Sequence, residues 1–203
     1  MPGPVRTPNA ERSQATRLRL LEATVECLAE LGWSGTSTTV IAERAGVSRG
    51  AQLHHYPTKN DLVIAAIGHL AIRRAEELHA VAARLPDGPG RTAAVLDQLA
   101  LHHTGPLFTA ALEVWVAART DSALRAALLP AEATLGRQLH HLAAQMLGAD
   151  ESRPGVREAV QTTFDLLRGL GVAGLISDDS ARRAAVLAHW ARTLDQQLEA
   201  DRA

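Results

Sequence analysis

Side chains that can pair with the edges of DNA bases are gathered in one short stretch, residues 49–55. Arg49 and Gln52 lie three residues apart, so a helix would place them on one face, with His54 at its flank. Arginine can bind guanine through two hydrogen bonds, and glutamine can bind adenine in the same way. We therefore predict that Arg49, Gln52 and His54 read bases in the major groove.

The neighbouring residues offer groups that suit the phosphate backbone of DNA. We expect His55 and Lys59 to contact phosphates, and Thr39 to add a hydroxyl or backbone N–H contact. Ser48 is expected to cap a helix by accepting a hydrogen bond from an exposed backbone N–H, and we count it among the DNA-binding residues. The alternative for His54 and His55 is a pair of partly exposed surface histidines.

Two short helices joined by a tight turn must position these groups. Ile41, Ala42 and Ala45 form the apolar face of the first helix. Gly46 follows, where a helix commonly ends on a residue with a positive φ. The second helix should span residues 49–56. This layout is that of a DNA-binding helix-turn-helix, although many all-helical proteins also contain two helices joined in this way.

From about Arg12 to Leu62 the chain resembles the N-terminal DNA-binding domain of the TetR family of transcriptional regulators. The matching residues are Gly32-Trp33, Thr36-Ser37, Ile41-Ala42, Ala45-Gly46-Val47-Ser48, Gly50, His55-Tyr56, Lys59 and Leu62. The resemblance implies an all-α fold, with a three-helix helix-turn-helix domain followed by a helical bundle that binds a small-molecule effector and forms a homodimer. The chain departs from the family at Leu53, where a tyrosine often helps to hold a phosphate.

Composition agrees with a helical protein. Of the 203 residues, 46% are hydrophobic and only 3% are aromatic, which favours helices over a β-sandwich or barrel. The net charge of −1 means that any contact with DNA must come from a local patch. The single cysteine, Cys27, excludes an internal disulfide. Because we find neither a signal peptide nor a run of roughly 18 apolar residues, we expect a cytoplasmic protein without membrane contact.

We divide the chain into a disordered arm at residues 1–10, a DNA-binding domain at 11–71 and an effector-binding and dimerisation domain at 72–203. The first domain should contain a long helix over residues 11–31 before the helix-turn-helix. A helix over residues 59–84 should connect the two domains. The further helices are expected at residues 91–103, 106–119, 122–147, 153–175 and 179–201.

A small-molecule pocket is expected in the second domain, because an apolar helical bundle that carries a few polar groups can hold such a ligand. The candidate pocket residues are His103, Phe108, Glu113, Trp115 and Arg119. The alternative is that the aromatic residues are core and the charged residues form a surface pair. We expect no metal and no cofactor, because the adjacent histidines at 102–103 and 140–141 would point about 100° apart on a helix.

The last two helices carry apolar residues at helical spacing. From these stripes we predict a dimer interface formed by Phe164, Leu167, Gly171, Gly174, Leu187, Trp190 and Leu194. The same stripes could instead cover the core of their own domain.

Three classes of function are compatible with these patterns. The first is a ligand-responsive transcriptional regulator, most often a repressor, that binds a double-stranded operator as a dimer and is released by a small molecule. Its two recognition helices would lie about 34–36 Å apart, one turn of DNA. The second is an enzyme in a helical bundle, against which we find no nucleophile–base motif, phosphate loop or metal spacing. The third is an adaptor whose head does not bind DNA.

Overall fold

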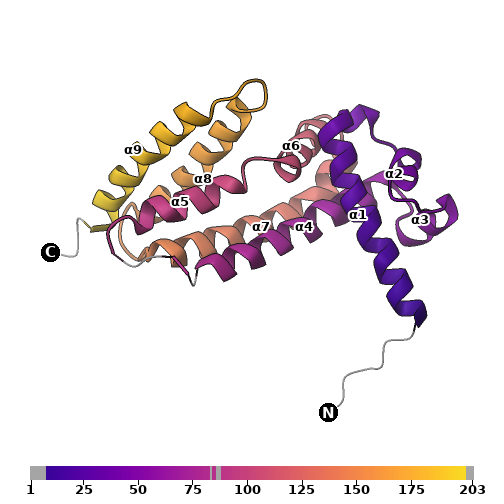
Figure 1. The fold of residues 1–203 in the computed structure, drawn as a ribbon, viewed down its shortest axis with the longest axis horizontal. Coiled ribbons are helices and arrows are strands. Elements are labelled where there is room, and N and C mark those ends of the chain that lie inside the picture. The colour runs from indigo at the N-terminus through magenta and orange to yellow at the C-terminus, as the bar shows by residue number, and fades with distance from the viewer. Residues whose placement is uncertain (1–7, 83, 86–87, 200–203) are drawn as a thin grey trace, which may run out of the picture. The chain divides into compact units, whose positions relative to one another are not determined.

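The computed structural model describes residues 8–82, 84–85 and 88–199, and every regular element in these ranges is an α-helix (Figure 1). The all-α class is therefore confirmed. The helices are α1 (Pro8–Gly35), α2 (Thr38–Arg44), α3 (Arg49–His55), α4 (Lys59–Ala82), α5 (Arg91–Leu101), α6 (Pro106–Ala118), α7 (Ser122–Leu147), α8 (Val156–Ala173) and α9 (Ser180–Glu199). Within these ranges, no helix combines the length and the apolar character that a membrane crossing requires.

The first helix differs from its prediction at both ends. It begins at Pro8, so residues 8–10 of the predicted disordered arm are helical, while residues 1–7 lie outside the described part of the chain. Proline suits a first helical turn because the N–H that it lacks would have no helical partner there. At the other end the helix is interrupted at Gly32, where φ is +67° and ψ is 179°, and it resumes for one more turn.

The chain forms two compact units. Unit 1 comprises the described residues up to Ala71 together with residues 109–131, and unit 2 comprises residues 72–108 together with those from Glu132 onward. The first break between the units follows Ala71, within α4. Most of α6 and the start of α7, which lie in the expected effector domain, cluster instead with α1, α2 and α3.

In unit 1, α1 packs against α2, and α2 packs against α3. The buried side chains of α1 recur at helical spacing and include Leu21, Val25 and Leu28. Burial of such a stripe is what fixes a short, marginal helix such as α2 in place.

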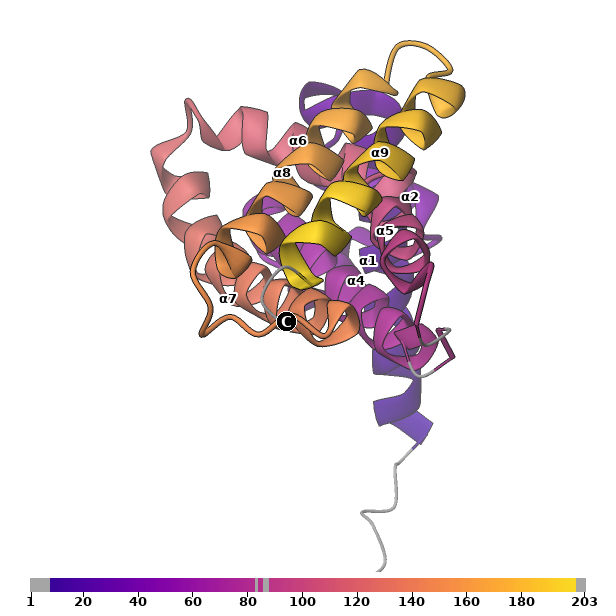
Figure 2. The same cartoon turned by 90° about the vertical axis from the view of Figure 1, so that its left-hand side faces the viewer.

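In unit 2, α5 packs against α8 and α9, and these two helices also pack against each other (Figure 2). Their core includes Val95 and Leu99 of α5, Val160 of α8, and Leu194 of α9. The C-terminal part of α7 adds Met146 to the same cluster.

The stripe that we predicted as a dimer interface lies inside this bundle. Leu167, Leu187 and Leu194 are buried in the core of unit 2, and the half-buried Trp190 donates its indole N–H to Thr163 Oγ1 at 2.9 Å. Phe164 and Gly174 are also partly buried.

Gly171, from the same stripe, lies so close to unit 2 that a Cβ built on it would stand 2.3 Å from the backbone oxygen of His103. For the four stripe residues that the chain itself buries, namely Leu167, Gly171, Leu187 and Leu194, a role in a subunit interface is not compatible with this structure. The partly buried Phe164, Gly174 and Trp190 remain predicted interface residues.

Candidate DNA-binding site

The turn between α2 and α3 has the geometry of a helix-turn-helix. Ser37 Oγ accepts a hydrogen bond from the N–H of Val40 at 3.2 Å and caps the start of α2. Gly46 takes a φ of +61°, which lets the chain reverse where a side chain would strain the backbone. Ser48 Oγ then accepts from the N–H of Ala51 at 3.3 Å and begins α3. The predicted cap at Ser48 is confirmed.

The exposed face of α3 differs in one residue from the predicted base-reading set. Arg49, Leu53 and His54 are exposed, whereas Gln52 is fully buried. The Gln52 amide donates to the backbone oxygen of Tyr56 at 2.7 Å and so closes the end of the helix. Reading of a base by Gln52 is therefore not compatible with this structure. Residues three apart on a helix are separated by about 60° around its axis, which is enough to place one in solvent and the other in the core.

The predicted phosphate ligands have different surroundings. Thr39 is exposed on the first turn of α2. His55 is half-buried, and burial, together with the neighbouring His54 and Arg17, lowers the pKa of its imidazole. His55 is thus suited to donate an N–H to a phosphate as a neutral ring. Its ring lies edge-on to that of His54, with 5.4 Å between the two centroids.

Lys59 makes two contacts within unit 1. Its ammonium donates to the backbone oxygen of Trp33 at 2.6 Å, and the same nitrogen lies 3.7 Å from the centroid of the indole ring. Burial lowers the pKa of the ammonium. A lysine has three donors, so a contact with phosphate would use those that Trp33 leaves.

The five residues predicted to line a pocket fall into two groups. His103 and Phe108 belong to unit 2, with their ring centroids 5.7 Å apart, and the ring of Phe164 lies 6.2 Å from that of His103. Glu113, Trp115 and Arg119 belong to unit 1. Glu113 accepts a hydrogen bond from the backbone N–H of Trp33 at 2.8 Å, a contact that we did not anticipate from the sequence.

Of the pocket candidates, His103 has the most defined chemistry. Its Nδ1 lies 3.1 Å from the backbone oxygen of Leu99, so this nitrogen carries the proton and donates it. Burial lowers the pKa of the ring, which keeps it neutral and leaves Nε2 as an acceptor. Among the described residues, no three His, Cys, Asp or Glu side chains are placed to hold a metal ion.

Comparison with known proteins identifies the family. The model of the bacterial regulatory proteins of the tetR family matches residues 20–66, which include α2, α3 and the start of α4. The chain is 32% identical to the HTH-type transcriptional regulator CymR of Pseudomonas putida, over 88% of this chain and 89% of that protein. The chain belongs to the tetR family. It is also 28% identical to the regulator BetI of Pseudomonas aeruginosa, over 90% and 92% of the two chains.

Solved structures of other transcriptional regulators share the fold. A TetR transcription regulator from Haloarcula marismortui superposes with a TM-score of 0.68 at 20% identity, over 92% of this chain and 98% of that one. FadR from Bacillus subtilis, solved in complex with stearoyl-CoA, gives a TM-score of 0.66 at 18% identity, over 87% and 96%. As a member of the tetR family, the protein is a helix-turn-helix transcriptional regulator, like the relatives CymR and BetI.

Proposed function

We propose that the protein is a dimeric repressor that binds an operator through the exposed face of α3 and is released by a small molecule. The observation that carries this proposal is the exposed surface that Arg49, Leu53 and His54 form on α3 of the helix-turn-helix. Arg49 is exposed at the start of α3, so its guanidinium is accessible to a ligand. Such a regulator would act in the cytoplasm, where its operator lies.

Each residue of this surface has a distinct role in the proposal. Arg49 binds guanine through two hydrogen bonds, and Leu53 offers an apolar contact to the 5-methyl group of thymine. His54 lies beside them. Thr39 and His55 contact the flanking phosphates, which fixes the register of α3 without reading sequence.

The test of the proposal begins with a duplex enriched from a random library by the unmodified protein. Arg49→Ala should lose discrimination at one base pair by about 1–3 kcal/mol, because a bidentate contact to guanine is worth that much. Arg49→Lys keeps the charge but not the planar pair of donors, so it should bind unrelated duplexes with the same salt dependence as the unmodified protein. An equal loss on every sequence for Arg49→Ala would show that Arg49 contacts only the backbone. An enzyme or an adaptor would enrich no sequence.

We further propose that a second copy covers the outer face of α8 and α9. Exposed apolar side chains gather where these helices meet, namely Val172, Leu175 and Ile176, and the last of these is 96% exposed. Ala184 and Ala188 of α9 are exposed one turn apart, which would let another helix approach closely.

Two variants distinguish loss of the dimer from loss of folding stability. Ala188→Glu should yield a folded monomer with weakened operator binding, because a charge on the outer face opposes dimerisation but not packing of the chain. Trp190→Glu should instead lower the midpoint of unfolding, because Trp190 packs inside unit 2. Analytical ultracentrifugation together with circular dichroism measures both effects. A dimeric Ala188→Glu variant at micromolar concentration would exclude this face.

For the effector, we propose a small molecule that contacts the rings of His103, Phe108 and Phe164 and donates a hydrogen bond to His103 Nε2. The contacts between these rings and the fixed tautomer of His103 support this assignment. The test is release of the enriched duplex by a panel of small aromatic alcohols, which carry an O–H donor, and their methyl ethers, which carry none. His103→Phe should weaken release by compounds that carry a donor and spare release by those that carry none.

A further inference from the structure

Helix α1 is interrupted by a corner at Gly32 and Trp33, and the backbone conformation at the first of these two residues favours glycine. Gly32 has a φ of +67°, a conformation that L side chains rarely adopt. A Cβ on Gly32 would also lie 3.0 Å from Glu113 Oε2. The corner thus brings the backbone of α1 into direct contact with a carboxylate of α6.

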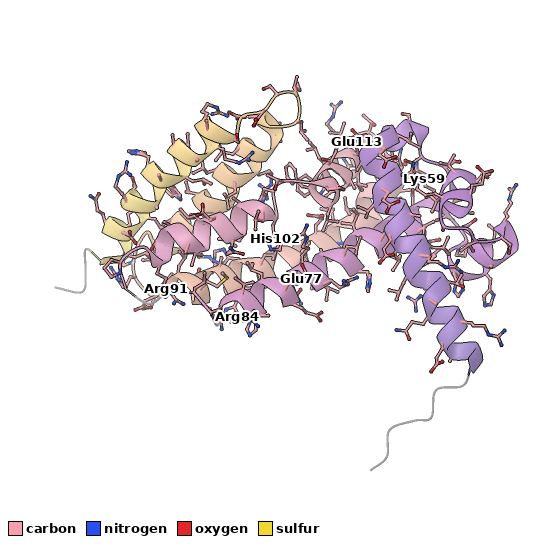
Figure 3. The ribbon with its side chains drawn as sticks, in the orientation of Figure 1. Lys59, Glu77, Arg84, Arg91, His102 and Glu113 are labelled. Carbon is pink, nitrogen blue, oxygen red and sulfur yellow. The ribbon has the colours of Figure 1, made fainter. Side chains whose placement is uncertain are left out.

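Trp33 is held through both of its backbone polar groups by charged side chains of opposite sign. Because Gly32 interrupts the helix, the N–H of Trp33 needs a partner outside it, and Glu113 Oε2 accepts this hydrogen bond at 2.8 Å. Lys59, the first residue of α4, donates to the Trp33 oxygen at 2.6 Å and lies over the indole ring. Hydrogen bonds to charged groups are the stronger class, and the cation–π contact adds to them. Figure 3 shows Lys59 on α4 and Glu113 on α6.

Only a few residues connect this corner to the first helix of the helix-turn-helix. Thr36 donates its hydroxyl to the backbone oxygen of Gly32 at 2.7 Å, and the next residue, Ser37, caps α2. In turn, α2 packs against α3. A displacement at Trp33 would therefore reach the start of α2 within one helical turn of chain.

We infer that Glu113 is a positioning residue for DNA binding: from α6 it fixes the Gly32–Trp33 corner and thereby the orientation of α2 and α3, without itself touching DNA. This inference rests on the proposed role of α3 in reading the operator. Glu113 lies 80 residues after Trp33 in the chain, and the two meet within unit 1.

The experiment compares Glu113→Ala with Glu113→Gln on two duplexes, one enriched by the unmodified protein and one of scrambled sequence. Loss of a negative charge by itself would strengthen binding to a polyanion. Positioning predicts instead that Glu113→Ala binds the enriched duplex about tenfold more weakly than the unmodified protein. On the scrambled duplex, its affinity should change no more than loss of one negative charge alone would change it. Glu113→Gln should restore the affinity to within about twofold, because the amide oxygen can still accept from the Trp33 N–H. Glu11→Ala, which removes the same charge from an exposed site on α1, is the matched control.

Two further measurements distinguish positioning from a loss of stability. Amide hydrogen exchange at Trp33 should accelerate in Glu113→Ala and not in Glu113→Gln, while circular dichroism should show equal helix content in all variants. If Glu113→Ala does not fold, Glu113→Asp provides the same test, because its carboxylate is one methylene too short.

The outcomes are separable. An unmodified protein that prefers no sequence overturns the proposed function and this inference together. Two results would overturn the inference alone, provided that the unmodified protein prefers its enriched duplex. One is an unchanged preference in Glu113→Ala, and the other is an equal loss of preference in Glu113→Ala and Glu113→Gln.

Discussion

Two glycines in long helices should respond to alanine with opposite signs. Gly171 of α8 faces the interior of unit 2, where a Cβ would lie 2.3 Å from the backbone oxygen of His103 and 2.8 Å from Cε1 of Phe108. Gly136 of α7 is exposed, and a Cβ there would meet no atom within 4 Å. Gly136 is also outside α8 and α9, whose outer face we propose a second copy covers.

The magnitudes follow from the two environments. Alanine is favoured over glycine inside a helix by about 1 kcal/mol, so Gly136→Ala should raise the free energy of unfolding by roughly that amount. Gly171→Ala gains the same helix propensity, but its methyl group must displace a backbone carbonyl and an aromatic ring. Overpacking of this kind costs about 1–3 kcal/mol, and we expect a cost near the upper end of this range because a backbone carbonyl moves less easily than a side chain. We therefore expect Gly171→Ala to be destabilised by about 1–2 kcal/mol net.

The assay is urea unfolding followed by circular dichroism at equal protein concentration, with the midpoint compared at unchanged slope. The midpoint should rise for Gly136→Ala and fall for Gly171→Ala. Equal stabilisation of both variants would refute the close approach of α8 to His103. It would also return Gly171 to the list of residues available to a second copy.

Two further predictions concern pH and DNA sequence. Burial, reinforced by Arg74, lowers the pKa of His102 to about 4, so between pH 4 and its ordinary value of about 6.5 the unfolded chain binds a proton that the folded chain excludes. The free energy of unfolding should therefore fall as the pH drops through this window. The melting temperature of His102→Gln should fall less than that of the unmodified protein over the same range. Identical pH profiles of melting temperature for the two proteins would contradict this reasoning. For Leu53, replacement of thymine by deoxyuridine at the contacted position should weaken binding of the unmodified protein and leave Leu53→Ala unaffected, measured by fluorescence anisotropy. Equal weakening in both proteins would show that Leu53 does not touch the methyl group.

The local structure of the DNA-binding head could be read from the sequence. Ser37 and Ser48 cap α2 and α3, and Gly46 turns the chain between them. These features depend on hydrogen bonds and backbone angles within about four residues, so the neighbouring residue types determine them. The same holds for α5, α6 and α7, whose bounds agree with the predicted ranges to within two residues at each end. The family resemblance rested on this same local pattern.

Packing decided which faces those helices bury. Gln52 and Leu53 are adjacent, and a polar residue followed by an apolar one suggests that the first is exposed and the second is core. The structure reverses this, because the Gln52 amide closes α3 on the oxygen of Tyr56 while Leu53 remains 44% exposed. The stripe that contains Leu167 and Leu194 was correctly recognised as apolar, but no pattern in one chain states whether its own core or a second copy covers it.

The contact between Glu113 and Trp33 had no sequence signal at all. The two residues are 80 positions apart, and neither lies in a motif that implies the other. Their hydrogen bond exists because α6 packs within unit 1 beside an interrupted α1, where a backbone N–H has lost its helical acceptor. Sequence thus determined the helices and the chemistry that they carry, since both depend on nearby residues. The tertiary structure decided which of those groups meet, since burial and long-range hydrogen bonds depend on how the helices pack.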